Sequence, residues 1–458
     1  MRVNRSLVKI LLAGMPVLGI AVWVRLHHVA VRKPPPPPPE VIAPQILELD
    51  AQLSRLQAAV AKSPKDSAAR LALADFFQKI GRADKTAEQL EVVARLEPDR
   101  QEAQIALGTA HLALMQPKEA EVVFRTVTRR WQRNVQGWQG LATAFYHQKR
   151  FLEAVTADRV AVSLDTREPN GRYILATSLL EYALQFPDPM EHMAALKEAR
   201  DNFRMVLAAW PEQGDIYYRL ARTSMEMHDK RMSIKNFRRA MELLPEKPEI
   251  PWQLAQAYNM AGDKTAARKV LAEAIVKHPR YAGLHDMLGK LLLASGEPGA
   301  DQTALEHFRT AVQIAPGVPA FQERYGTSCL RVNQLDEART AFERAQQLDP
   351  NRVYPYQQLS AVYTRLGDQR KASLAARTAV QMTFNDQQLK RFMAESSANP
   401  DNVNLHMILA ERYQQLKMKG AAKDELLMIL QRDPSNKLAR RELEQLASVA
   451  RTEPTAPK

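Results

Sequence analysis

Large apolar residues recur four positions apart along most of this chain, and a small residue recurs beside the first of each pair. In the clearest case Leu141 is followed by Phe145, and Ala142 stands next to the leucine. A spacing of i, i+4 places both large side chains on one face of a helix. The small neighbour leaves room for a second helix, in which Ala154 and Ala161 accept the contact. The pattern therefore predicts closely packed pairs of short helices.

The same arrangement returns at regular intervals, and prolines follow it. Nine prolines stand 34 residues apart within their groups: Pro64 and Pro98; Pro211, Pro245 and Pro279; Pro316 and Pro350; Pro400 and Pro434. A proline suits the end of a unit because it cannot continue a helix. Ten helix–turn–helix units are predicted, starting near residues 67, 101, 135, 169, 214, 248, 282, 319, 353 and 403.

The unit that starts near residue 135 resembles the tetratricopeptide repeat, since it reads Trp138, two residues, Leu141, Ala142, two residues and Phe145. The resemblance covers roughly residues 45–449. It implies an all-α fold, a right-handed superhelical solenoid of about ten repeats whose first helices line a concave groove. It also implies a chain that holds partner proteins or peptides and is not an enzyme.

Three departures from the period qualify this picture. Eleven extra residues precede Pro211, and we expect them in the turn of the fourth repeat, around residues 185–190. Three extra residues are expected near Gly296 and Gly299. Sixteen extra residues, roughly 385–400, fit one unpaired helix. Helices over 45–62 and 437–449 are expected to cap the two ends, because a terminal repeat has one face without a neighbour.

The composition agrees with a helical fold and limits the classes of partner that the chain is expected to bind. Glycine is scarce, at 17 residues, and good helix formers dominate, so almost no sheet is expected. The net charge of +13 is spread along the chain. Anionic polysaccharide therefore stays a candidate partner, whereas nucleic acid is not expected because no nucleic-acid-binding motif is present. The single cysteine, Cys329, is expected in the core.

The N-terminal residues predict a membrane anchor. Residues 7–24 form an apolar run broken only by Lys9, and Arg2 and Arg5 precede it. A basic start before an apolar stretch is typical of a signal peptide or an uncleaved anchor, and we expect the anchor because no small-x-small cleavage site follows. We expect a single-pass protein of the bacterial inner membrane with its repeats in the periplasm. The inverted, cytoplasmic orientation is the alternative.

A proline-rich spacer follows the anchor. Residues 34–39 are six consecutive prolines, which favour a polyproline II rod of about 19 Å that holds the repeats away from the membrane. We therefore divide the chain into a basic tail (1–6), an anchor (7–24), a linker (25–44), the main repeat array (45–384), a lone helix with the last repeat and a capping helix (385–449), and a disordered tail (450–458).

A partner surface is predicted on the first helices of repeats four to six. Tyr173, Tyr218 and Trp252 occupy equivalent positions there, and the predicted set is completed by Thr177, Arg222 and Gln256 one turn further on, with Asn259 and Tyr146. Aromatic rings can stack on a peptide or a sugar while polar neighbours form hydrogen bonds to it. The alternative is that these rings pack against neighbouring helices.

Catalysis has no support in the sequence. We find no phosphate-binding loop, no His-Glu-x-x-His motif and no nucleophile elbow, and no cofactor or metal is predicted. The leading hypothesis is a membrane-anchored scaffold that binds partner proteins and assists the assembly of a cell-envelope complex. Two alternatives are a carbohydrate-binding component of a polysaccharide export pathway and, if the anchor is inverted, a regulator of an enzyme on the cytoplasmic side.

Overall fold

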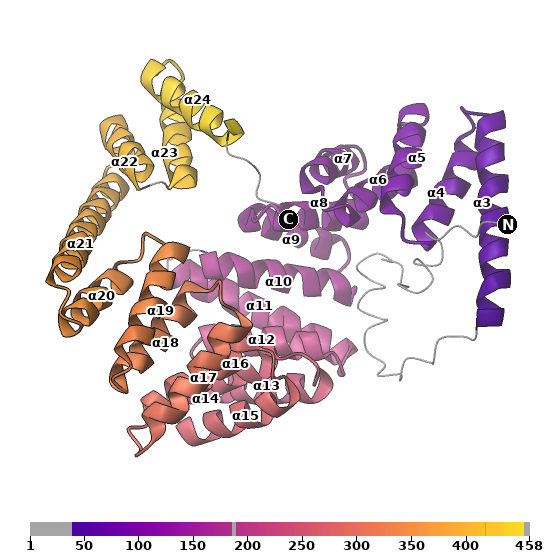
Figure 1. Ribbon diagram of the computed structural model, residues 1–458. Helices are drawn as coiled ribbons and strands as arrows, with labels where there is room; N and C mark the ends of the chain where they lie inside the picture. Colours follow the sequence, from indigo (N-terminus) through magenta and orange to yellow (C-terminus); the bar gives the residue numbers. More distant parts are fainter. Residues whose placement is uncertain (1–38, 186–188, 417, 453–458) are drawn as a thin grey trace. The chain divides into compact units, whose positions relative to one another are not determined.

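The computed structural model describes residues 39–185, 189–416 and 418–452 (Figure 1). Over these ranges every regular element is an α-helix, 22 helices in all, as predicted. The predicted basic tail and membrane anchor lie outside the described residues, and so does the polyproline rod except for Pro39. Within the described ranges, no helix combines the length and the apolar character needed to cross a bilayer.

The helices form two compact units, one ending at Ala267 and one beginning at Arg268 inside helix α15 (Lys264–Lys277). Unit 1 holds α3 (Pro39–Lys62), α4 (Ser67–Lys79), α5 (Ala83–Leu96), α6 (Gln101–Ala113), α7 (Pro117–Arg130), α8 (Val135–His147), α9 (Phe151–Leu164), α10 (Pro169–Gln185), α11 (Pro189–Ala209), α12 (Gly214–Glu226), α13 (Lys230–Leu243) and α14 (Glu249–Ala261). Unit 2 holds α16 (Ala282–Leu293), α17 (Ala300–Ile314), α18 (Pro319–Arg331), α19 (Leu335–Leu348), α20 (Val353–Arg365), α21 (Gln369–Ala398), α22 (Val403–Gln415), α23 (Lys419–Arg432) and α24 (Lys437–Thr452).

All ten predicted repeat starts are confirmed as helix starts. Each even-numbered helix from α4 to α22 begins within one residue of a predicted repeat start. Within each unit the two helices of a repeat pack on each other, and the second helix packs on the first helix of the next repeat. The structure is therefore a stack of helix pairs in both units.

Small residues beside the large side chains of the i, i+4 pairs allow this packing. The ring of Phe124 in α7 lies against Gly108 of α6 and Gly140 of α8, where a Cβ atom would stand 2.6 and 2.3 Å from its atoms. In unit 2 the ring of Phe308 lies on Gly289 in the same way. A larger residue at these glycines would collide with a fully enclosed phenyl ring.

Where the structure describes the whole turn between the two helices of a repeat, that turn holds a left-handed residue. Glycine fills this position in some repeats, for example Gly81 with φ 71°. Met115, Lys149 and His228 adopt it in unit 1 with φ of 55–59°, and Asn333 does so in unit 2 with φ 64°. A side chain other than glycine pays a steric cost in this conformation, so these turns are imposed by the packing of the helices on either side.

The eleven extra residues of the fourth repeat lie in its helices, which corrects the prediction of a longer turn. Helix α10 has 17 residues and α11 has 21, against 13 and 14 in the second repeat. Four and seven additional residues account for the excess. Leu180 and Ala183 of α10 are buried in one apolar cluster with Leu196 and Ala199 of α11, so the longer helices continue to pack on each other. The excess near Gly296, in contrast, lies in the turn as predicted.

The separate helix predicted over residues 385–400 does not exist. Helix α21 runs for 30 residues from Gln369 to Ala398 and crosses the expected domain boundary at residue 384. No glycine or proline interrupts this stretch, so nothing local ends the helix. Its far half continues the fold, since Leu389 is buried with Leu409 and Tyr413 of α22.

Both capping helices are present, with longer bounds than predicted. Helix α3 begins at Pro39, so residues 39–44 belong to a helix and not to the expected linker; proline is well suited to a first helical position. Leu49 and Leu53 of α3 pack on Phe76 and Phe77 of α4. At the other end α24 continues to Thr452, into the predicted tail.

Candidate functional site

The first helices of neighbouring repeats approach one another directly. In unit 1 α6 contacts α8, α8 contacts α10 and α10 contacts α12; in unit 2 α18 contacts α20. The second helix of a repeat separates two first helices along the chain. First helices that still contact each other must lie on the side of the stack where the repeats are most closely spaced. We call this side the inner face. Its defining position is the fifth residue of each first helix, or the fourth in α14: Leu71, Ile105, Gln139, Tyr173, Tyr218 and Trp252 in unit 1; Asp286, Glu323, Gln357 and Met407 in unit 2.

The predicted tyrosines lie on the inner face and also pack within their own repeats. The ring of Tyr173 meets the buried Phe203 of α11 edge-on, with centroids 6.3 Å apart. Tyr218 meets the buried Phe237 of α13 in the same way at 6.0 Å. Both tyrosines are half-buried. The rings therefore pack against neighbouring helices, which was the alternative to a partner surface, and each tyrosine keeps some exposure to solvent.

Tyr146 and Trp252 continue this surface. Tyr146, at the end of α8, packs edge-on against Phe151 at 5.3 Å. Burial raises the pKa of Tyr146, against the opposing effect of the Arg219 charge. Trp252 is half-buried on α14, and its Nε1 is enclosed without a hydrogen-bond partner among the described residues. An enclosed N–H donor without an acceptor is costly in a folded protein.

The predicted polar neighbours are less available than the sequence suggested. The hydroxyl of Thr177 donates to the carbonyl of Tyr173 at 2.9 Å, and its residue is buried. Arg222 pairs with Glu181 of α10 at 3.3 Å. Gln256 and Asn259 are half-buried on α14. Arg222, which we expected to bind a partner, therefore already has an anionic partner within the chain.

Arg219 is the important residue that the sequence reasoning missed. Its Nε donates to the hydroxyl of Tyr173 at 3.0 Å, and its guanidinium lies 5.6 Å from the centre of that ring. Its charge also acts on Tyr146. Arg219 thus joins residues of α8, α10 and α12 into one cluster. The available signal was its position directly before the Leu220-Ala221 pair, which places it beside Tyr218 on the same helix.

Unit 2 places an arginine at the same position, with a different partner. Arg324 stands directly before Tyr325-Gly326 and donates to the carboxylate of Asp286, the inner-face residue of the preceding repeat. Lys290 also pairs with Asp286, at 3.0 Å. The Asp286 side chain is only 4% exposed, so this carboxylate is buried but fully paired.

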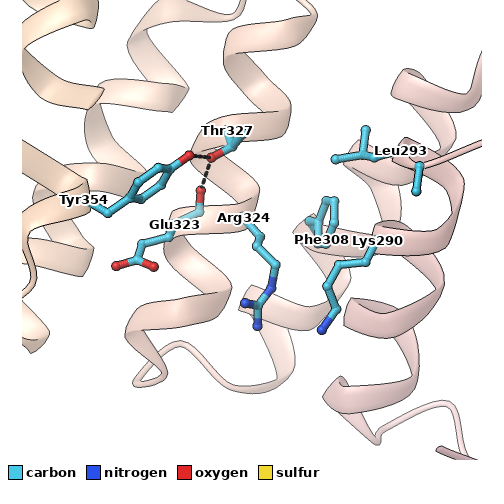
Figure 2. Close-up of a pocket in the computed structure, with 8 residues that line it drawn as sticks. Lys290, Leu293, Phe308, Glu323, Arg324, Thr327 and Tyr354 are labelled. Atoms are coloured by element: carbon cyan, nitrogen blue, oxygen red, sulfur yellow. Dashed lines mark hydrogen bonds between the residues drawn. The ribbon is translucent and has the colours of Figure 1, made fainter. Parts of the chain in front are cut away.

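A cavity of about 390 Å³ adjoins this ion cluster (Figure 2). Figure 2 shows Lys290 and Arg324 side by side at one wall, with Phe308 behind them and Glu323 nearby. The polar groups have partners: the Glu323 carboxylate accepts from Nε and one terminal nitrogen of Arg352, and Thr327 shares a hydrogen bond of 2.9 Å with Tyr354. The charged side chains that line the cavity are therefore already paired within the chain, and the rest of its wall is mostly apolar.

The described residues contain no group of three or more His, Cys, Asp or Glu side chains placed to hold a metal. His285 and His307 form a pair with their Nδ1 atoms 3.2 Å apart, and burial lowers the pKa of both. Cys329 is fully buried, as predicted, and burial raises its pKa to about 11. Its thiol therefore stays protonated at neutral pH and acts as a core residue. The chemistry that this surface offers is recognition by aromatic rings and hydrogen-bond donors.

Comparison with known proteins agrees with the fold. The tetratricopeptide repeat family model matches residues 105–169 in unit 1 and 287–353 in unit 2. No curated protein matches the sequence.

Several solved structures share helical repeats with this chain at low identity. A tetratricopeptide repeat protein from Parabacteroides merdae is 15% identical, with 57% of this chain and 98% of that chain covered and a TM-score of 0.43. Human IFIT1, solved as a dimer with PPP-AAAA, is 12% identical, with 84% and 94% covered and a TM-score of 0.37. MamA is 17% identical, with 37% and 97% covered and a TM-score of 0.34.

The chain's own repeats agree with this match. All ten predicted repeats begin within one residue of a helix start, glycines accept the second helices, and the family model matches segments of both units. Residues 105–169 and 287–353 therefore carry tetratricopeptide repeats.

Proposed function

We propose that this protein is a membrane-anchored, non-catalytic scaffold that binds partner proteins on its inner face and assists the assembly of a cell-envelope complex. Tetratricopeptide repeats in general serve protein–protein interaction. The observation that carries the proposal is the cluster of Tyr146, Tyr173 and Arg219, which combines half-buried rings with a cation on one surface. Rings and arginines of this kind dominate the energetics of protein interfaces.

A peptide fits this surface better than a sugar does. Stacking on a sugar requires an open aromatic face, but Tyr173 and Tyr218 each direct one side toward a buried phenylalanine and are half-buried. A peptide can instead accept hydrogen bonds from Arg219. We therefore favour protein partners over the polysaccharide that the sequence left open.

The location in the cell envelope rests on the sequence before residue 39. The apolar run 7–24 with its basic start supports an anchor, and the six prolines support a spacer between the bilayer and the repeats. A short basic tail normally remains in the cytoplasm, so the repeats would face the periplasm. Protease added to spheroplasts tests this: digestion of the repeats supports the orientation, and full protection until the membrane is lysed overturns it.

The binding function is tested by crosslinking in cells followed by affinity capture of the full-length chain. We expect specific proteins to be captured by the wild type and lost from the Tyr218→Ala, Trp252→Ala double variant. Val122→Ser is the matched control, because Val122 is 67% exposed on α7, a second helix. If the double variant captures the same proteins as the wild type, the inner face is not the binding surface.

A further inference from the structure

We propose that Arg219 is the docking point for an acidic side chain, aspartate or glutamate, of the partner protein. The proposal rests on the proposed function and names the chemistry that the inner face of unit 1 recognises. The observation that supports it is the set of groups around Arg219. This largely buried cation donates to a neutral phenol, whereas Arg222 and Arg324 on the same face of their units pair with carboxylates.

Arg219 has no ion pair with any described residue. Its side-chain partners are phenols: its Nε donates to the Tyr173 hydroxyl at 3.0 Å, and it also interacts with the hydroxyl of Tyr146. Asp215 acts on it electrostatically, but the carboxylate of Asp215 binds Nζ of Lys247 at 2.7 Å. On the same surface Glu181 pairs with Arg222. The charge of Arg219 is therefore not neutralised by a contacting carboxylate within the chain.

The position of Arg219 makes an unpaired charge expensive. Its guanidinium is surrounded by protein atoms on most sides, yet the residue keeps some exposure to solvent. A cation in such surroundings loses part of its hydration and gains from an anion that comes into contact with it. Because solvent reaches the residue, the side chain of a docked partner can reach it too.

The donors around Arg219 match a carboxylate. A guanidinium carries five N–H groups in a planar fork suited to two-point contact with a carboxylate, and the hydrogen bond to Tyr173 uses one of them. Because the Tyr173 oxygen accepts from Arg219, its own proton can point to a ligand. Burial raises the pKa of Tyr146, so this phenol also keeps its proton at neutral pH.

The acidic residues on this part of the surface disfavour a polyanion. Glu181 pairs with Arg222, Asp215 pairs with Lys247, and Glu249 acts electrostatically on Tyr218 beside Arg219. A single carboxylate can contact Arg219, whereas a polyanion would require a row of unpaired cations and would be repelled by these acids.

The test is a selection of random twelve-residue peptides against the full-length chain, followed by binding titrations of the enriched sequences. We expect enrichment of an Asp or Glu at a defined position beside apolar residues. Replacing that acid by its amide should weaken binding at least about tenfold, since hydrogen bonds to charged groups are worth more than neutral ones. Arg219→Gln should cause a similar loss and should no longer discriminate acid from amide.

Two controls keep the result specific. Arg324→Gln removes the arginine at the same position of unit 2 and should leave peptide binding unchanged. Tyr173→Asp places a carboxylate where unit 2 has Asp286; it should pair with Arg219 and abolish the preference for acidic peptides while the chain remains folded by circular dichroism. This variant tests the proposal even if Arg219→Gln proves unstable.

The outcomes separate this proposal from the proposed function. Peptides that bind without any preference for acid over amide, or a preference that survives Arg219→Gln, overturn the Arg219 site while leaving the scaffold intact. Failure to enrich any peptide, together with the absence of crosslinked proteins, overturns both. Binding of an anionic polysaccharide such as alginate that depends on Arg219, without any acidic peptide, also overturns the proposal.

Discussion

Arg219 in unit 1 and Arg324 in unit 2 occupy the same position in their repeats, and each donates to the inner-face residue of a preceding repeat. For Arg324 that residue is Asp286, whereas for Arg219 it is Tyr173. The carboxylate neutralises its arginine and the phenol does not. One geometry therefore stabilises the fold in unit 2 and leaves a charge for a partner in unit 1. The identity of one neighbouring side chain decides between the two outcomes.

The largest expected effect concerns a buried carboxylate in unit 1 that, unlike Asp286 in unit 2, is not paired with a cation. Asp158 of α9 is 1% exposed and receives only the Ser178 hydroxyl, at 2.6 Å, and burial raises its pKa to about 8. This value lies above that of an unfolded aspartate, so its stabilising contribution is complete below about pH 4 and is lost as the pH rises toward 8. We expect a loss on the order of 3 kcal/mol between pH 5 and pH 8.

Urea unfolding of the wild type and Asp158→Asn at both pH values measures this effect. The asparagine variant cannot ionise, so most of the pH dependence should vanish. If Asp158→Asn shows the same loss of stability as the wild type, another group is responsible.

A slightly smaller effect is expected when the ion pair of unit 2 is broken. Asp286→Asn leaves Arg324 and Lys290 without their shared carboxylate, and we expect a loss of about 2–3 kcal/mol, below the range for fully buried pairs because both cations keep some exposure. Tyr173→Phe in unit 1 removes one hydrogen bond from the Arg219 guanidinium but breaks no ion pair, and should cost about 1.5 kcal/mol. Urea unfolding compares the two, and equal losses would contradict the contrast.

The turns provide a third comparison, of about 1 kcal/mol. Met115 in unit 1 holds a left-handed conformation that disfavours its side chain, so Met115→Gly should stabilise the chain by about 0.5–1 kcal/mol. Asn333 in unit 2 has a similar φ, but asparagine tolerates it and its side chain accepts an exposed hydrogen bond from Arg365, so Asn333→Gly should not stabilise the chain. Thermal unfolding of both variants checks the difference; destabilisation by Met115→Gly would show that the methionine side chain contributes packing.

The smallest effect is expected at Arg222, which lies close to Arg219 on α12. Because Arg222 is already paired with Glu181, Arg222→Gln should change the affinity for acidic peptides by no more than about threefold. The same titrations that test Arg219 measure this. A loss as large as that of Arg219→Gln would move the docking point to Arg222 and restore the interpretation made from the sequence alone.

The sequence was sufficient for the repeats and insufficient for the contacts between them. Helix starts could be predicted because the i, i+4 pairs and the prolines are local signals. The length of α21 could not be predicted from the period, because inserted residues can extend a helix or form a new one. The sequence favoured Arg222 as a binding residue, because its ion pair with Glu181 could not be foreseen. Glu181 lies 41 residues away in the chain, and no local pattern reveals that pair.

The continuous helix α21 has a consequence for how the C-terminal part unfolds. In most repeat arrays each unit can separate from its neighbour at the turn between them. Here the second helix of the ninth repeat extends to carry Leu389 into the core of the tenth. Melting of the last repeat must therefore expose part of a helix that the ninth repeat also uses. The two repeats are coupled into one cooperative folding unit, in which local fraying at the end of the chain is opposed by the repeat before it.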